Sequence, residues 1–148
     1  MENEDLGIKY KDFLAKLSGC PFCENKNRII FETKNSFLTY SLWPYHKHHL
    51  LIIPKRHVES LTELNNEERK EIDSLQEKAL EILKKLGYIS ITHLVREGND
   101  VNKSIRHVHF HTIPNIRIGD LDHYGKERRM LNEGEINETI LDIKKFLI

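Results

Sequence analysis

Apolar residues follow two different periods along the chain, and each period predicts one kind of element. Five segments are rich in branched and aromatic residues and predict β-strands, namely residues 28–32, 36–43, 49–53, 88–96 and 105–113. Apolar and polar residues alternate in the last two, as in half-buried strands. The third is a continuous apolar run closed by a proline, which predicts a buried strand.

Helical spacing of apolar residues occurs in three further places. Residues 5–17 predict a short helix that ends before a Ser-Gly pair. The longest helix should begin at Asn65, which can cap it with Glu68 at the capping-box position, and should end at Gly87. Residues 136–147 predict a last helix near the C-terminus.

The connections between the predicted strands decide the fold class. Residues 33–35 and 97–104 are too few to carry a crossover between parallel strands, so they predict antiparallel pairing. We therefore expect an α+β fold with about five strands, a long helix, and N- and C-terminal helices. The charged segment 117–133 is expected to be extended and partly exposed, and residues 1–148 to form a single domain.

Composition restricts the classes of function. With 148 residues, of which 39% are hydrophobic, the chain can bury a core. It carries 23 basic and 23 acidic residues, so no global field would attract it to nucleic acid or to an anionic membrane. An acidic start without an apolar segment, and the lack of any run of about 18 apolar residues, predict a cytoplasmic protein without membrane spans.

The most informative motif is the run His107-Val108-His109-Phe110-His111. On a strand the three histidines share one face, with side chains roughly 6.6 Å apart. A face buried only for packing would not carry three such rings, because each unpaired buried polar group costs about 1–3 kcal/mol. The pattern therefore indicates chemistry, either at the imidazoles themselves or as ligands of zinc, copper or iron.

Two cysteines, Cys20 and Cys23, stand two residues apart in Cys-Pro-Phe-Cys. This spacing is typical of a metal site or a redox pair, and both suit a reducing compartment. Two free thiols in a turn are the third interpretation. A glutaredoxin-like pair would follow a first strand and open a helix, whereas here the predicted helix precedes the pair.

Two separated segments resemble the histidine triad (HIT) family. The run from His107 to Pro114 resembles the family signature of alternating histidines, with a polar departure at Thr112. The run from Trp43 to His57 resembles the upstream segment, in which a histidine leads into an apolar strand and then Pro-Lys-x-His. The resemblance spans about Cys20 to Pro114 and implies a five-stranded antiparallel sheet with a long helix, usually paired into a homodimer.

The resemblance implies a nucleotidyl hydrolase or transferase acting on a dinucleoside polyphosphate, a nucleoside phosphoramidate or a similar compound. His109 would attack the α-phosphorus through Nε2, with its proton held on Nδ1 by a backbone carbonyl. His111 and His49 match positions that bind the phosphate oxygens and the leaving group, as imidazolium or N–H donors.

Further positions match the family's nucleotide-binding residues. Leu42 and Leu51 match the lining of the base pocket, and Ser41 stands where Asp or Asn usually binds the ribose. In the loop before the triad, Asn102, Lys103 and Ser104 are expected at the phosphate, with Lys103 where glutamine is frequent.

Zinc-containing HIT relatives complete an early cysteine pair with two histidines. The matching ligands here are Cys20, Cys23, His57 and His107. The resemblance therefore implies a structural zinc ion that joins the N-terminal segment to the catalytic strand.

Two alternatives to a nucleotidyl-histidine enzyme stay open. The departures at Ser41, Lys103 and His48, which stands where glycine is usual, favour a noncatalytic nucleotide-binding module. The other is a metal-dependent enzyme in which the triad itself holds a catalytic ion.

Overall fold

The chain divides into two compact units, Met1–Ile116 and Arg117–Ile148. A computed structural model describes residues 19–24, 29–41, 44–98, 105–115 and 129–146. The helix predicted over residues 5–17 lies outside the described residues. That residues 1–148 form one domain stays a prediction.

The first unit is built on a five-stranded sheet in the order β1-β2-β3-β5-β4, in which every pairing is antiparallel. The predicted α+β class is therefore confirmed. The strands are β1 (Phe31–Glu32), β2 (Ser36–Tyr40), β3 (Leu50–Pro54), β4 (Ile91–Val95) and β5 (Phe110–Pro114). A short α2 (Pro21–Glu24) precedes the sheet, and a 3₁₀ turn, η2 (Leu61–Glu63), follows β3.

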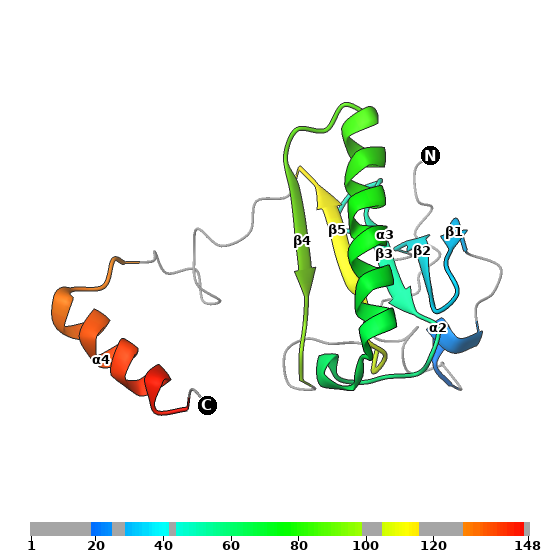
Figure 1. Ribbon diagram of the computed structural model, residues 1–148. Helices are drawn as coiled ribbons and strands as arrows, with labels where there is room; N and C mark the ends of the chain where they lie inside the picture. The colour runs from blue at the N-terminus through cyan, green and yellow to red at the C-terminus, as the bar shows by residue number, and fades with distance from the viewer. Residues whose placement is uncertain (1–18, 25–28, 42–43, 99–104, 116–128, 147–148) are drawn as a thin grey trace, which may run out of the picture. The chain divides into compact units, whose positions relative to one another are not determined.

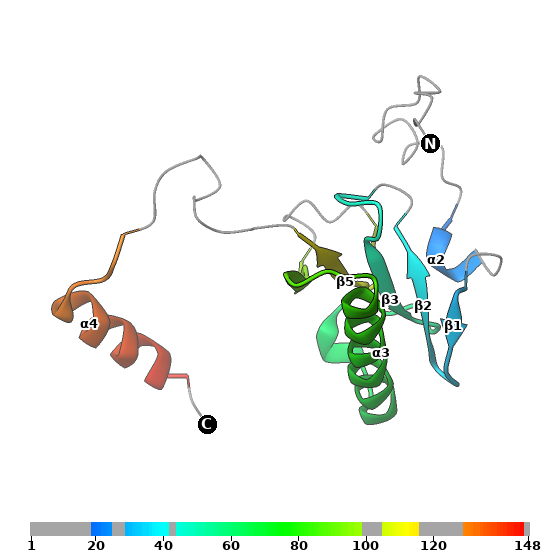
Figure 2. The same cartoon turned by 90° about the horizontal axis from the view of Figure 1, so that it is seen from above.

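The long helix α3 (Asn66–Lys85) has the predicted start and end. Asn65 accepts from the backbone N–H of Glu68, and the Glu68 side chain accepts from that of Asn65, which completes the capping box. After the helix, Gly87 takes a positive φ of 96°. Figures 1 and 2 show α3 lying along one face of the sheet, where it contacts β2, β3 and β5.

The strand that carries the triad is shorter than predicted. β5 begins at Phe110, so His107 and His109 precede the paired strand. Between them, the backbone N–H of Val108 donates to the carbonyl of Val58, 2.8 Å away, instead of to a sheet neighbour. The pairing of β3 with β5 stops at Ile52 and Phe110.

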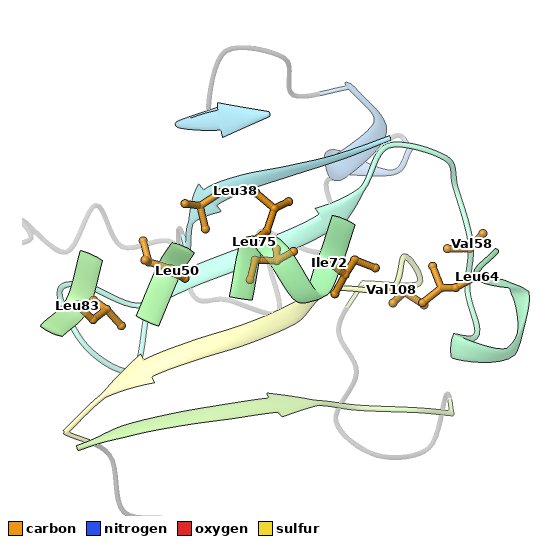
Figure 3. Packing of buried hydrophobic residues seen from close by; sticks show 10 residues of the cluster. Leu38, Leu50, Val58, Leu64, Ile72, Leu75, Leu83 and Val108 are labelled. Atoms are coloured by element: carbon orange, nitrogen blue, oxygen red, sulfur yellow. The ribbon is translucent and has the colours of Figure 1, made fainter. Parts of the chain in front are cut away.

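Two cores lie on the two faces of the sheet. The core under α3 contains apolar residues from the sheet, the helix and the segments around them (Figure 3): Leu38, Leu50, Ile52, Val58, Leu64, Ile72, Leu75, Ala79, Leu83 and Val108. A smaller cluster of Phe37, Leu51 and Ile53 lies on the opposite face. Phe22 and Ile29 pack against it, so the segment around α2 covers part of that face.

In the second unit, α4 (Glu133–Lys144) begins three residues earlier than predicted. The reason is a capping box, in which Asn132 accepts from the Glu135 backbone N–H and the Glu135 side chain accepts in return. The predicted extended segment 117–133 is described only from residue 129, and its last residue belongs to the helix.

Candidate active site

The three triad histidines lie on the sheet face away from α3. Their neighbours Val108 and Phe110 pack in the core under α3, and side chains alternate between the faces along an extended chain. On the paired part of that face His111 stands opposite Leu51 of β3. The ring centroids of His109 and His111 are 4.9 Å apart, closer than the side-chain spacing expected for an ideal strand.

A backbone carbonyl holds one proton of His109 on Nδ1. The Nδ1 of this half-buried ring lies 2.7 Å from the carbonyl oxygen of His107. Because a carbonyl only accepts, Nδ1 carries the proton and donates it. Nε2 then holds the lone pair of the neutral ring, which is the tautomer that nucleophilic attack requires.

His49 and His111 form a buried histidine pair on the same face. The backbone N–H of Tyr45 donates to His49 Nδ1 over 3.2 Å, so the proton of that ring is on Nε2. His49 Nε2 lies 2.8 Å from Nδ1 of His111 and donates to it. His111 therefore carries its own proton on Nε2, where it can donate to a ligand.

Both rings of this pair are held neutral. Burial, and then the charges of His109 and Arg96, lower the pKa of His49 to about 4. Burial, followed by the charges of His109, His49 and Arg96, lowers the pKa of His111 to about 3. Of the two forms expected from the sequence, the structure thus favours neutral N–H donors over imidazolium ions.

Two aromatic side chains support these rings. Phe22 of α2 lies edge-on to His109 and His107, with centroid distances of 5.0 and 5.8 Å. The ring of Tyr45 stacks on His49 with centroids 5.8 Å apart. Neither residue has a pattern in the sequence that predicts this role, although Phe22 stands between the two cysteines and Tyr45 lies in the upstream motif.

The expected nucleotide-binding residues are only partly described. Leu51 lies beside His111, and the half-buried Ser41 donates its backbone N–H to the carbonyl of His49 over 3.0 Å. The structure thus brings both positions to the histidine pair. The remaining four, Leu42, Asn102, Lys103 and Ser104, lie outside the described residues.

Cys20, Cys23, His57 and His107 come together beside the triad, with all their ligand atoms within 4.8 Å of one another. Nδ1 of His107 lies 3.2 and 3.4 Å from the sulfurs of Cys20 and Cys23. Nδ1 of His57 lies 3.3 Å from the sulfur of Cys23. Cys20 directly precedes α2 and Cys23 lies within it, whereas His57 follows β3 and His107 precedes β5.

The chemistry of this cluster fits zinc. Nε2 of His107 donates to the carbonyl of Pro54 over 2.7 Å, so its Nδ1 presents a lone pair to the cysteines. Two sulfurs and two imidazole nitrogens are a tetrahedral zinc donor set, and a bound ion would contribute a fixed crosslink. Among the described residues this is the only such group, and it contains a single triad histidine.

A bound cation would favour the thiolate form of Cys23, which its surroundings disfavour. Desolvation, and then the hydrogen bond and charge of Cys20, raise the pKa of Cys23 to about 11. A divalent ion offsets the repulsion between two neighbouring thiolates.

Comparison with known families agrees with this geometry. The HIT domain model matches residues 23–117, well over half of the chain. The chain belongs to the HIT family. An uncharacterized HIT-like protein of Methanocaldococcus jannaschii is 27% identical over 131 residues, covering 84% of this chain and 98% of that protein.

Other family members show what the HIT family contains. A bis(5'-adenosyl)-triphosphatase of Dictyostelium discoideum is 27% identical over 95 residues, covering 64% of each chain, so the family includes nucleotide hydrolases. A HIT family protein from Bacillus subtilis shares the fold, with a TM-score of 0.69, 23% identity, and coverage of 88% of this chain and 98% of that one. Among the described residues, no helix is long and apolar enough to span a membrane.

Proposed function

We propose that this HIT protein transfers or hydrolyses nucleotidyl groups through a covalent intermediate on His109. The substrate would be a nucleotide derivative such as a dinucleoside polyphosphate or a nucleoside phosphoramidate. The observation that carries the proposal is the 2.7 Å bond from His109 Nδ1 to the His107 carbonyl, which leaves the nucleophilic lone pair on Nε2.

The reaction needs two displacements at the α-phosphorus. Nε2 of His109 forms a bond to phosphorus while the bond to the leaving group breaks and its electron pair goes to the leaving atom. The carbonyl oxygen of His107, which accepts the hydrogen bond from Nδ1–H, stabilises the positive charge that the ring acquires. Water or another acceptor then attacks phosphorus and loses a proton to solvent, while the bond between phosphorus and Nε2 breaks and its electron pair returns to Nε2.

The histidine pair would act on the oxygens around that phosphorus. His111 donates from Nε2, and His49 sets its tautomer through the 2.8 Å bond between them. Since both rings are neutral, His111 can stabilise developing charge as a hydrogen-bond donor at no cost in burying a cation, and His49 acts only through its bond to His111.

Zinc is proposed as a structural ion held by Cys20, Cys23, His57 and His107. It would fix the position of His107, whose carbonyl orients the nucleophile.

The family resemblance also suggests a homodimer, which light scattering after size-exclusion chromatography would test. The cytoplasmic location expected from the sequence stays a prediction.

The decisive test compares wild type with His109→Ala on diadenosine triphosphate and adenosine 5'-phosphoramidate, following the release of AMP. We expect turnover by wild type and a loss of at least about 10³-fold in the variant, since the first displacement has no nucleophile. Trapping AMP on the wild-type protein by a denaturing quench at alkaline pH, where the P–N bond survives, should show one added nucleotidyl group by mass spectrometry.

Retained turnover in His109→Ala would remove His109 from this role. If wild type binds AMP but turns over neither substrate, the noncatalytic alternative is favoured instead. Because the described metal-ligand group contains Cys20 and Cys23 and leaves out His109 and His111, the catalytic-metal alternative has no support in the described geometry.

A further inference from the structure

Arg96 is a basic residue beside the candidate active site that the proposed mechanism does not use. It directly follows β4, whose Leu94 stands opposite His111 of β5. Residues two apart on a strand project from the same face, so Arg96 shares the face of Leu94 and His111. The last pair of the two strands is Val95 and Phe110, so Arg96 and His109 each stand one residue beyond the same end of this pairing.

The next residue along the chain supports this orientation. The carboxylate of Glu97 accepts from the Ser60 hydroxyl at 2.6 Å and from the Leu61 backbone N–H at 3.0 Å. Leu61 packs against the core under α3, so Glu97 is held towards that side of the sheet. Its neighbour Arg96 therefore points to the other side, where the histidines lie.

The charge of Arg96 reaches the histidine pair. Burial, and then the charges of His109 and Arg96, lower the pKa of His49, and the same causes together with His49 act on His111. None of the ion pairs found within the described part of the chain includes Arg96. Arg96 is half-buried, so water and salt screen its charge less than they screen the charge of an exposed side chain.

We propose that Arg96 is a specificity-determining residue that binds the phosphate groups of a negatively charged leaving group. This inference rests on the proposed function, because it assigns the leaving-group side of the same site. A planar guanidinium can donate two parallel hydrogen bonds to phosphate oxygens and is charged at every physiological pH. A phosphate-bearing leaving group gains from this contact, and an uncharged amine does not.

The consequence is a preference for dinucleoside polyphosphates over phosphoramidates. Both substrates place the same adenylyl group on His109, so the contacts to the nucleoside and the α-phosphate are shared. Only the polyphosphate leaves as an anion next to Arg96, and a charge-assisted bond contributes most where water is partly excluded.

The test measures kcat/KM for diadenosine triphosphate and adenosine 5'-phosphoramidate in wild type, Arg96→Gln, Arg96→Lys and Arg106→Gln. Arg106 is an exposed arginine that serves as the matched control. We expect Arg96→Gln to lose about 10- to 100-fold on the triphosphate and less than about 3-fold on the phosphoramidate. Arg96→Lys should recover part of the loss, and Arg106→Gln should match wild type.

Equal losses on both substrates, or none on either, would overturn the inference while leaving His109 catalysis intact. If wild type turns over neither substrate, calorimetry with ADP and AMP decides. We then expect wild type to bind ADP at least about 10-fold more tightly than AMP and Arg96→Gln to lose that preference. Equal binding of the two by wild type, or a preference that survives in Arg96→Gln, would also refute the role.

Discussion

At the scale of single residues, His107 joins two functions that act through different atoms. Its ring offers Nδ1 to the cysteine sulfurs and donates from Nε2 to the Pro54 carbonyl. Its own carbonyl accepts the Nδ1 proton of His109. A shift of this residue would therefore change both the candidate metal centre and the nucleophile.

The histidine pair leads to a prediction about protonation. Because the pKa values of His49 and His111 are lowered to about 4 and about 3, both rings should stay neutral from pH 8 down to about 5. NMR titration of the Cε1–H resonances, assigned with His49→Gln and His111→Gln, measures this directly. If the resonance of either ring titrates between pH 6 and 7, the prediction that both buried rings stay neutral is wrong.

The same lowered pKa values affect stability. The unfolded chain takes up these two protons near pH 6.5 and the folded chain only near pH 4 and below, so acid favours unfolding. The free energy of unfolding should fall between pH 6.5 and 5, by at most about 1.4 kcal/mol per pH unit for each histidine. Urea denaturation at several pH values should show a smaller slope for His111→Gln than for wild type.

At the scale of elements, the segment between β3 and α3 holds the pieces of the site together. Arg56, next to His57, donates to the carboxylate of Glu68 at 2.8 Å and to the carbonyl of Glu63 at 2.7 Å. Further along, the carbonyl of Val58 accepts the backbone N–H of Val108. A candidate metal ligand and the start of the triad are thus attached to the N-terminus of the long helix.

Glu68 is the centre of that attachment and is only 1% exposed. We expect Glu68→Gln to destabilise the fold by about 1–3 kcal/mol, because it weakens the capping box and a charge-assisted bond to Arg56 at once. Glu67→Gln is the matched control, since it removes the same charge from the same helical turn at an exposed position. Chemical denaturation of both variants checks this, and equal losses would show that only the helix dipole matters.

At the scale of the whole first unit, the four candidate zinc ligands tie α2 to the sheet. Phe22, between the two cysteines, packs on His107 and His109, so the segment that carries the cysteines also contacts the candidate nucleophile. A crosslink between distant parts of the chain stabilises the folded state by the free energy of metal binding.

Metal content and thermal stability test this tie. Elemental analysis should find one zinc per chain in wild type and in His109→Ala, and loss of the ion in Cys23→Ser. Chelation should lower the Tm of wild type by several degrees and leave that of Cys23→Ser nearly unchanged. An ion lost from His109→Ala but kept in Cys23→Ser would place the metal on the triad instead.

Patterns among neighbouring residues predicted much of this fold. They failed where a residue distant in the sequence forms a hydrogen bond with the backbone. The Asn65–Glu68 capping box and the antiparallel sheet follow from near neighbours and were predicted. The late start of β5 was not, because Val58 takes the backbone N–H of Val108. Arg96 gave no signal beyond one position in an alternating pattern, and its place beside the histidines depends on strand pairing.

The sequence by itself determined the class of fold and the chemical types at the site, because spacing fixes which residues share a face and which can ligate a metal. Tertiary structure decided the tautomers of His107, His49 and His111, whereas that of His109 was already expected from the family resemblance. Which nitrogen holds each proton depends on the Pro54 and His107 carbonyls, the Tyr45 backbone N–H and the His49–His111 contact. Three of these four contacts depend on how the chain folds back on itself. Those of His107 with Pro54 and of His49 with His111 join segments far apart in the sequence, and that of Tyr45 with His49 crosses a turn.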